Sequence, residues 1–421
     1  MRVLHSSDWH IGRTFHGHAT LDALAEALGE LPRIVRERQV DAVLVAGDVF
    51  DSAAPSAQAY RLLGDVLREV RGAGAAVVLS SGNHDSPARL GFQAEWAQAA
   101  GVHVRTDPSR LDRPVELADP RDEAGPLLVY ALPYLEPVLV RHRLPAPPGA
   151  DEREQAVPAG HAAVLGRAME LVRADLERRR AAGSAPRSIV MAHCFAAGAA
   201  AAEGELERDI TRGGLDLVPP ELFAGVDYVA LGHLHRRARL RDRAGLRVRY
   251  SGAPLHLSFA EADSPRGCWL IDFDAHGVRE TGGRAAIEWV PLPVPRPLVT
   301  LRGELARLLT DPTNEPWEQA WVRAVLTDRV RPVDPMRRLQ ERFPRCALIE
   351  FDPPGSPERD GGDYGQRVRS AASDEELLAG FLAHVRDGAG PSPAERELLA
   401  EIVAAERAGP DGDEGGTEPG A

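Results

Sequence analysis

The chain has 421 residues, a net charge of −13 and 43% apolar residues. That length exceeds what one hydrophobic core usually organises, so two or three domains are expected. The sequence contains no lysine, which excludes Schiff-base and P-loop lysine chemistry. Its three cysteines are widely spaced and fit reduced thiols better than a disulfide framework or a cysteine-rich zinc site.

We predict neither a membrane-spanning segment nor a signal peptide from this sequence. No run of about 18 uncharged apolar residues occurs, and the first residues lead into strand-like sequence without a signal-peptide cleavage site. We therefore expect a soluble, cytoplasmic protein. Residues 408–421 are rich in glycine, proline and acid and carry no base, so we expect a disordered tail.

Two predicted strands near the N-terminus are followed by polar side chains. A short strand over 2–6 leads into Asp8 and His10, which face the same way on an extended segment because they are two residues apart. A buried apolar strand begins at Val43 and ends in Asp48. Taken alone, each motif is more often an ordinary turn than a ligand site.

Two amphipathic helices flank the second of these strands. The first extends over residues 21–38 and is expected to break or kink at Pro32, and the second extends over residues 57–71. Strands that alternate with helices predict a layered α/β fold.

The next strand, over residues 77–80, ends in Gly-Asn-His-Asp at 82–85. The chain contains only two asparagines, so this tetrapeptide at a strand end has chance odds of about one in a hundred or less. An Asx turn accounts for Asn83 but gives no reason for His84. The motif therefore favours a ligand or catalytic site.

The middle of the chain continues the alternation. We predict a strand over 127–132, a solvent-exposed loop over 137–158 and a charged, exposed helix over 167–180.

Two later strands end in histidines. Residues 188–192 precede His193, and residues 227–231 precede a glycine followed by His233 and His235. A lone histidine such as His193 is more often structural than a ligand. The pair two residues apart can hold one ion from the same side of the chain.

Five polar clusters thus follow strand ends, and layered α/β sheets bind ligands beyond the carboxyl ends of their strands. We expect them to converge on one edge of the sheet. The set contains two acids, one amide and four histidines: Asp8, His10, Asp48, Asn83, His193, His233 and His235. This mixture suits two divalent ions of intermediate hardness, such as manganese, iron or zinc, whereas magnesium would favour fewer nitrogens.

These motifs, in this order and spacing, resemble those of the calcineurin-like metallophosphoesterase superfamily. Within it, the chain is similar to the SbcD family, the nuclease subunits of bacterial SbcCD DNA-end processing complexes. The narrower similarity depends on four segments, LHSSDWHIG at 4–12, VAGDVFD at 45–51, DYVALGHLHR at 227–236 and YSGAPLHLSFAE at 250–261.

The resemblance implies a role for each ligand. Asp48 would bridge two metal ions, for which manganese is favoured. The other ligands would divide between the two ions, with Asp8, His10 and His235 at one and Asn83, His193 and His233 at the other. His84 would bind no metal but would act beside the scissile phosphate. Cys194, where the family usually has a small polar residue, is expected to be a buried structural thiol.

Arginines near these motifs are candidate phosphate contacts, although any of them can also be a solvated surface residue. They are Arg13, Arg89, Arg212, Arg236 and Arg237.

The resemblance also implies a domain organisation. We expect a metallophosphoesterase domain over 1–290, a two-sheet sandwich flanked by helices, with predicted strands over 250–257 and 268–273 forming a second sheet. A small α/β capping domain over 291–352 would contact DNA. A linker and helical pair would follow over 353–407.

The helical pair has clear start signals, because Ser373 with Glu376 and Ser392 with Glu395 form predicted capping boxes. The pair either completes the core of the cap or, as the resemblance implies, docks on the coiled coil of an SbcC-type ATPase.

We expect a metal-dependent DNA nuclease that processes ends and hairpins in repair, recombination and replication. It would act at the nucleoid as a homodimer within a heterotetramer with the ATPase. One alternative is a hydrolase of small phosphodiesters, against which the long C-terminal extension argues. Another is a mainly structural DNA-end scaffold, against which the complete ligand set argues.

Overall fold

The computed structural model describes residues 1–119, 125–146, 157–198, 217–240, 246–281, 284–354, 373–385 and 390–408. The predicted contact Arg212, residues 147–156 of the predicted loop, residues 355–372 of the predicted linker and the predicted tail beyond 408 lie outside them. The chain divides into two compact units, Met1–Phe351 and Asp352–Ala421. No helix in the described ranges has both the length and the apolar character needed to cross a membrane.

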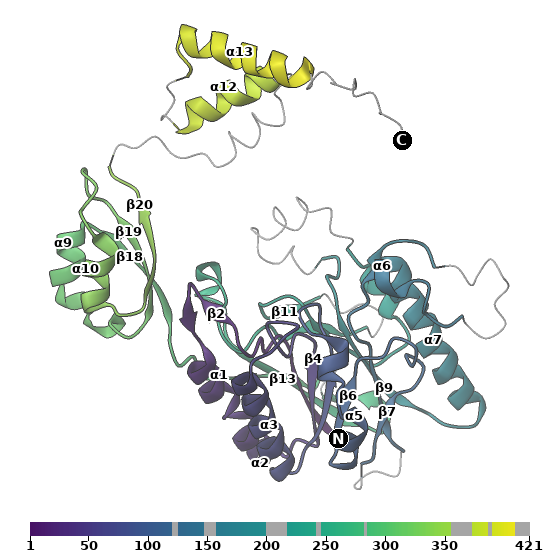
Figure 1. Cartoon of the computed structure of the whole chain (residues 1–421). Coiled ribbons are helices and arrows are strands. Elements are labelled where there is room, and N and C mark those ends of the chain that lie inside the picture. The colour runs from purple at the N-terminus through teal and green to yellow at the C-terminus, as the bar shows by residue number, and fades with distance from the viewer. Residues whose placement is uncertain are drawn as a thin grey trace, which may run out of the picture. The chain divides into compact units, whose positions relative to one another are not determined.

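Two β-sheets form the centre of the first unit (Figure 1). The first sheet consists, in order, of β14 (Gly277–Val278), β13 (Gly267–Asp274), β1 (Arg2–Ser6), β4 (Ala42–Ala46), β5 (Ala76–Ser80) and β6 (Val102–Arg105), with β17 (Ile287–Pro291) also paired to β13. The second consists of β11 (Ala238–Arg239), β12 (Val248–Tyr250), β10 (Tyr228–Gly232), β9 (Arg187–His193), β8 (Leu127–Ala131) and β7 (Val115–Leu117).

Each sheet has a parallel centre. Antiparallel pairs occur at β13, β14 and β17 of the first sheet and at β11 and β7 of the second, whereas the edge strand β6 is parallel to β5. Strands β1, β4, β5 and β6 are parallel, as are β12, β10, β9 and β8. Parallel strands point their carboxyl ends in one direction, which is why polar side chains after different strands can meet.

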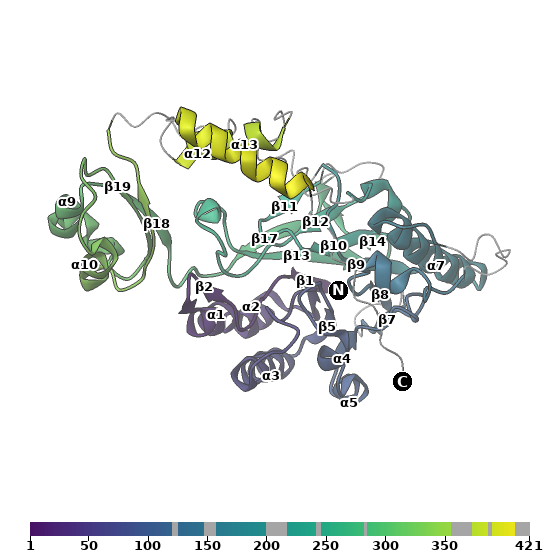
Figure 2. The same ribbon diagram turned by 45° about the horizontal axis from the view of Figure 1, so that its top comes forward.

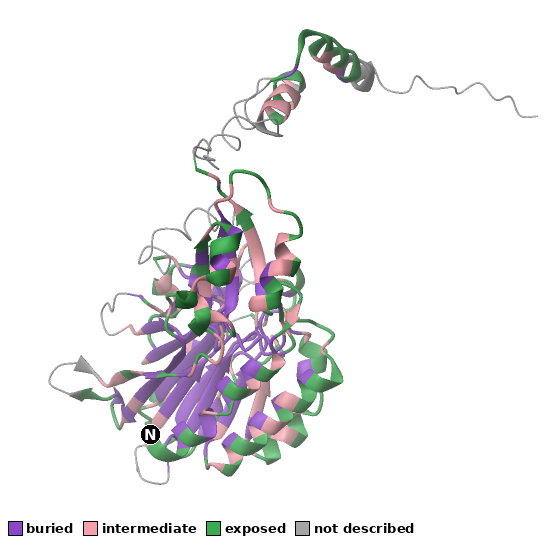
Figure 3. Ribbon diagram, turned by 90° about the vertical axis from the view of Figure 1, so that its left-hand side faces the viewer, coloured by how far each residue is buried: buried purple, intermediate pink, exposed green. Residues whose placement is uncertain are grey.

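Hydrophobic side chains between the sheets, including Val3, Leu44 and Met191, form one core. Helices cover the outer faces (Figure 2): α1 (Leu21–Leu28), α2 (Leu31–Arg38) and α3 (Ala57–Gly72) lie on the first sheet, and α6 (Pro137–Val140) and α7 (His161–Ala181) on the second. The strands are accordingly buried beneath helices that are exposed on their outer sides (Figure 3). The sandwich confirms the predicted fold class.

Several predicted elements differ from the structure. The first helix is interrupted at Gly29 and Glu30, and Pro32 occupies the first turn of α2, where its missing N–H costs nothing. The predicted loop over 137–158 contains α6. The predicted exposed helix is the longer α7, whose buried side includes Met169. Because α7 contains many arginines, the sequence did not indicate that its apolar residues form a buried face.

The predicted strand over 250–257 is also wrong. Strand β12 ends at Tyr250, and Gly252 turns the backbone with a φ of 73°, a value that favours glycine. Strands β12 and β13 do not share a sheet, because β12 pairs with β10 and β13 pairs with β1. Buried strands of both sheets are mostly apolar, so the sequence could not assign them to one sheet or the other.

A third, smaller sheet follows the sandwich. Strands β18 (Leu298–Gly303), β19 (Trp321–Leu326) and β20 (Cys346–Phe351) are parallel. Helices α9 (Leu305–Thr310) and α10 (Pro335–Arg342) pack on one side of them, around a core of their own that includes Leu305, Leu339 and Phe343. These elements agree with the predicted α/β layer.

The second unit contains α12 (Asp374–Val385) and α13 (Pro393–Ala408). The Ser392 hydroxyl accepts from the Glu395 N–H at 3.4 Å, and the Glu395 carboxylate accepts from the Ser392 N–H at 2.8 Å, which confirms that capping box. At the other helix, the Ser373 hydroxyl accepts from the Glu376 N–H at 3.2 Å.

The remaining elements are short. They are β2 (Thr14–Phe15), β3 (His18–Ala19), α4 (Pro87–Leu90), α5 (Ala94–Ala99), η2 (Pro220–Phe223), η3 (Phe259–Glu261), β15 (Glu280–Thr281), β16 (Arg284–Ala285) and η4 (Pro312–Trp317).

Candidate metal centre

The five predicted clusters come together where strands of both sheets end. Strands β1, β4 and β5 of the first sheet and β9 and β10 of the second deliver them. The prediction of a single sheet edge was therefore wrong, although the prediction of one site was right. Three overlapping groups have ligand atoms within 4.8 Å of one another: Asp8, His10 and His235; His10, Asp48 and His84; and Asp48, His193 and His233.

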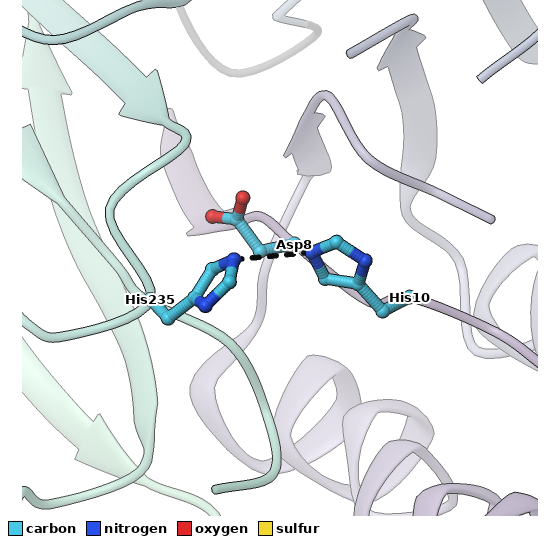
Figure 4. Close-up of side chains that lie close together, drawn as sticks. All are labelled: Asp8, His10 and His235. Atoms are coloured by element: carbon cyan, nitrogen blue, oxygen red, sulfur yellow. Dashed lines mark hydrogen bonds between the residues drawn. The ribbon is translucent and has the colours of Figure 1, made fainter. Parts of the chain in front are cut away.

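Asp8, His10 and His235 form the first group (Figure 4). The two histidines face each other through their Nε2 atoms at 3.2 Å. The Nδ1 atom of His10 donates to Asp51 Oδ1 at 3.1 Å, so the Nε2 of a neutral His10 carries a lone pair directed at His235. Asp8 is fully buried and accepts from the His233 backbone N–H at 2.9 Å.

Asp48 lies between the two predicted ion positions. Its Oδ2 atom is 3.5 Å from His10 Nε2 and 3.3 Å from His193 Nε2. His193 in turn reaches Asn83 Oδ1 at 3.0 Å and His233 Nδ1 at 3.1 Å. One carboxylate oxygen therefore faces ligands of both groups, as a bridging ligand requires.

The site fits cations because several of its contacts are repulsive without positive charge. The Nδ1 atom of His193 donates to the Ala46 carbonyl at 3.0 Å, which leaves the Nε2 of a neutral ring as an acceptor. That acceptor faces the oxygens of Asn83 and Asp48. Either a proton or a shared cation resolves this arrangement, and the mixed nitrogen and oxygen donors suit a divalent transition metal.

Burial and neighbouring charges shift the pKa values of His193 and Asp8 in opposite directions. Burial alone would lower the pKa of His193, but the Asp48 charge outweighs it and raises the pKa to about 9. Burial raises the pKa of Asp8 to about 6, against the opposing charge of His193. Burial, with the neighbouring His193 charge, lowers the pKa of His233 to about 2, and burial lowers that of His235 to about 3. Both of these rings are neutral at pH 7 and can bind metal directly.

His84 lies beside the ligands but is held differently. Its Nδ1 atom donates to the Asp51 carbonyl at 2.9 Å, and its backbone N–H donates to Asp48 Oδ1 at 2.9 Å. Its ring packs edge-on against His10 with centroids 4.8 Å apart. The structure thus places His84 within the site, where a ligand role and a role toward substrate are both geometrically open.

The backbone that carries these side chains is strained. Eight non-glycine residues in the described ranges have positive φ values, and four of them are the predicted ligands Asp8, His10, Asp48 and His233. Such conformations persist only where the surrounding structure enforces them, and they cluster at functional sites. Glycines permit the close approach: a Cβ on Gly47 would lie 2.2 Å from His193 Nδ1, and one on Gly82 would lie 2.1 Å from Asp48 Oδ1.

Two supporting acids were not assigned roles by the sequence. Asp85 accepts from the backbone N–H groups of Val49, Phe50 and Gly82 at 2.9–3.0 Å and so joins the loops after β4 and β5. Asp51 orients His10. Both acids lie in sequence motifs that resemble those of the metallophosphoesterase superfamily. This position is the signal by which the sequence could have identified them.

The predicted arginines have varied positions. Arg13 is paired with Asp51 at 2.9 Å and lies at the site. Arg236 donates to the Ala260 carbonyl, and Arg237 lies over the Trp289 ring at 5.0 Å. Arg89 is exposed and donates to the Ala53 carbonyl.

Cys194 is buried, and burial raises its pKa to about 12, as expected for a structural thiol.

Comparisons with known proteins agree with this geometry. Residues 1–237 match the calcineurin-like phosphoesterase family, and residues 294–386 match the type 5 capsule protein repressor C-terminal domain. The D subunit of the SbcCD nuclease from Rhodobacter capsulatus is 40% identical over 313 residues, covering 72% of this chain and 71% of that protein. The Bacillus subtilis protein of the same name is 34% identical, covering 65% of this chain and 66% of that protein.

Among solved structures, TT1561 of Thermus thermophilus is 13% identical with a TM-score of 0.35, covering 69% of this chain and 98% of that one. The family match over residues 1–237 includes every predicted ligand that converges in the structure. The chain belongs to the calcineurin-like phosphoesterase family and, within it, to the SbcD family of nuclease subunits.

Proposed function

We propose that this chain is a two-metal DNA nuclease that hydrolyses phosphodiesters at DNA ends and hairpins together with an SbcC-type ATPase. The observation that carries the proposal is the convergence of the seven predicted ligand side chains and His84 on one site in a member of a nuclease family. Repair, recombination and replication, in the cytoplasm at the nucleoid, are the processes in which such an activity would serve.

Each ligand has a defined task in this proposal. Asp48 would bridge two ions, with Asp8, His10 and His235 completing one site and Asn83, His193 and His233 the other. Bound divalent cations, for which we propose manganese, would lower the pKa of a water and offset the phosphate charge. Asp51 and the Ala46 carbonyl hold the rings of His10 and His193 so that Nε2 faces the site.

His84 would act on the substrate. Because its Nδ1 proton is committed to the Asp51 carbonyl, Nε2 is the atom that can donate a proton to the departing oxygen. Its position beside Asp48, which fixes its backbone, would keep this atom near the scissile phosphate. Arg13 and the other described arginines are proposed phosphate contacts.

The two C-terminal helices would dock on the ATPase. Their apolar side chains Leu377, Phe381, Leu398 and Ile402 are 38–55% exposed, which suits an apolar groove on a partner. The family assignment supports this partner. A homodimer within a heterotetramer is part of the proposal. The small sheet β18–β20, with its own core, would serve as the cap that contacts DNA.

One assay tests the proposal against its alternatives. The whole chain should cleave hairpin DNA with manganese, faster with the ATPase than without it, and should act poorly on a small phosphodiester such as bis(p-nitrophenyl) phosphate. Preference for the small substrate would favour a hydrolase of small phosphodiesters. DNA binding without cleavage of any substrate would favour a structural scaffold.

A further inference from the structure

A buried ion pair lies behind His235, outside the ligand set. Glu261 and Arg266 are 7% and 2% exposed, and Glu261 Oε2 is 3.3 Å from Arg266 Nη1. Removing two charges from water costs free energy that their mutual attraction only partly returns. Stability alone therefore does not explain why the buried pair of Glu261 and Arg266 lies behind His235.

Arg266 makes backbone contacts through Nη1 and Nε, while its buried Nη2 has no hydrogen-bond partner in the described part of the chain. Its Nη1 atom donates to the carbonyls of His235 at 2.7 Å, Ala253 at 3.3 Å and Leu255 at 3.4 Å, and its Nε donates to Ser264 at 3.2 Å. The guanidinium thus binds the main chain of His235 to the turn that follows β12. This role fixes the backbone of His235 but not its ring.

Glu261 divides its two oxygens between two directions. Oε2 accepts from the Leu257 N–H at 3.1 Å and faces Arg266. Oε1 lies 3.9 Å from His235 Nδ1, and no other carboxylate in the described ranges lies within ion-pair distance of that atom. A purely structural role of Glu261 explains the contacts of Oε2 but not the position of Oε1 near His235.

Three other histidines of the site show how such an Nδ1 nitrogen is supported, whereas His233 differs because its Nδ1 faces His193 Nε2 at 3.1 Å. His10, His84 and His193 each donate Nδ1–H to a carboxylate or carbonyl oxygen at 2.9–3.1 Å. His235 presents Nε2 to the site, 3.2 Å from His10 Nε2, so its Nδ1 is the atom that needs the same support. Such partners fix the tautomer and orientation of metal-binding histidines.

We propose that Glu261 is a positioning residue for metal binding, and that its Oε1 accepts from His235 Nδ1–H when His235 Nε2 holds a cation. This inference rests on the proposed two-metal function. An approach of about 1 Å brings the two atoms to hydrogen-bond distance, and such contacts are often long before the ligand binds. Arg266 then holds the carboxylate and the His235 backbone as one unit.

Manganese titration of the whole chain, followed by electron paramagnetic resonance of free Mn²⁺, tests the proposal. Glu261→Gln removes the charge and keeps the side-chain shape. It should weaken one of two manganese sites by about 10- to 100-fold and leave the other unchanged. Glu261→Asp keeps the charge and should fall between Glu261→Gln and wild type. Asp263→Asn, an exposed acid in the same turn, is the matched control and should bind as wild type.

Thermal unfolding of the metal-free variants separates positioning from folding. Glu261→Gln removes the counter-charge of the buried Arg266, so this variant should lose metal-free stability, whereas Glu261→Asp and Asp263→Asn should unfold within a few degrees of wild type. Manganese binding is therefore measured below the unfolding transition of every variant. Unchanged manganese binding in folded Glu261→Gln, or equal weakening of both sites, would overturn the proposal. Failure of the two-metal function itself is distinct, because wild type would then bind fewer than two ions.

Discussion

The site and the C-terminal helices break the ordinary distribution of side chains in opposite ways. In the first unit, Asp8 and Asp48 are almost completely buried, although carboxylates are rarely buried unless paired. In the second unit, Leu398 and Ile402 are 55% and 52% exposed. Buried polar groups and exposed apolar groups are the informative exceptions in a folded chain.

The two exceptions call for different ligands. Buried carboxylates beside inward-facing histidine nitrogens need positive charge, which small cations provide. Exposed apolar side chains on paired helices suit an apolar surface on another protein. The comparison therefore separates the proposed metal site from the proposed ATPase-binding helices, and we expect that each can be removed without the other.

The largest effect is expected from Asp48, whose loss removes the charge shared by both ions. Asp48→Ala should reduce cleavage by about 10⁴-fold or more, beyond the range of a single general acid. Asp48→Asn, which keeps the shape but not the charge, should lose a similar amount in the same nuclease assay. Retained activity in Asp48→Asn would show that the carboxylate charge does not hold the ions.

A smaller loss is expected from His84 if it acts on the leaving group. His84→Ala should reduce cleavage by about 10² to 10⁴-fold, the range of general acid catalysis. His276→Ala, an exposed histidine in a turn, serves as the control and should cleave as wild type. A decrease of less than tenfold in the His84 variant would assign the proton transfer to another group.

Substitutions in the C-terminal helical pair test the proposed binding of the ATPase. The double variant Leu398→Asp and Ile402→Asp should weaken binding of the ATPase by about 30- to 1000-fold, because buried apolar anchors dominate interface energies. The same charge placed at exposed Ala400, between them on another face of α13, should change binding little. Calorimetry with the purified ATPase gives both affinities.

Cleavage of a small phosphodiester without the ATPase should stay unchanged in both helix variants. Unchanged ATPase binding by the double variant, or by a chain truncated before Ser373, would show that the helices do not dock on this partner.

The smallest expected effect concerns protons in the buried site. His193 has a pKa of about 9 in the metal-free protein, so it is protonated at pH 7 and must lose that proton to bind metal. Metal affinity should therefore rise with pH, by at most about tenfold per unit, and should level off above about pH 9. Titration calorimetry in two buffers with different ionisation heats measures the released proton. A binding heat that does not depend on the buffer would contradict this account.

The sequence predicted many elements of both regions, but it did not predict how these elements are arranged in space. The strands before Asp48 and His193 were predicted because apolar runs end abruptly in polar motifs, and the capping box at Ser392 was confirmed. The assignment of strands to two facing sheets was not predictable, since central strands of both sheets, such as β4 and β10, are apolar along their length. The role of Glu261 was also hidden, because its partner His235 is 26 positions earlier and meets it only through the turn after β12.

Counting metal ions in the Asp48→Ala and His84→Ala variants tests the central claim most directly. Elemental mass spectrometry should find two manganese ions per chain in wild type and in His84→Ala, because His84 is proposed to act on substrate rather than to bind metal. Asp48→Ala should hold fewer ions, since only Asp8 would then contribute negative charge to the ligand set. Loss of an ion from His84→Ala, or two ions in Asp48→Ala, would contradict the assignment of these roles.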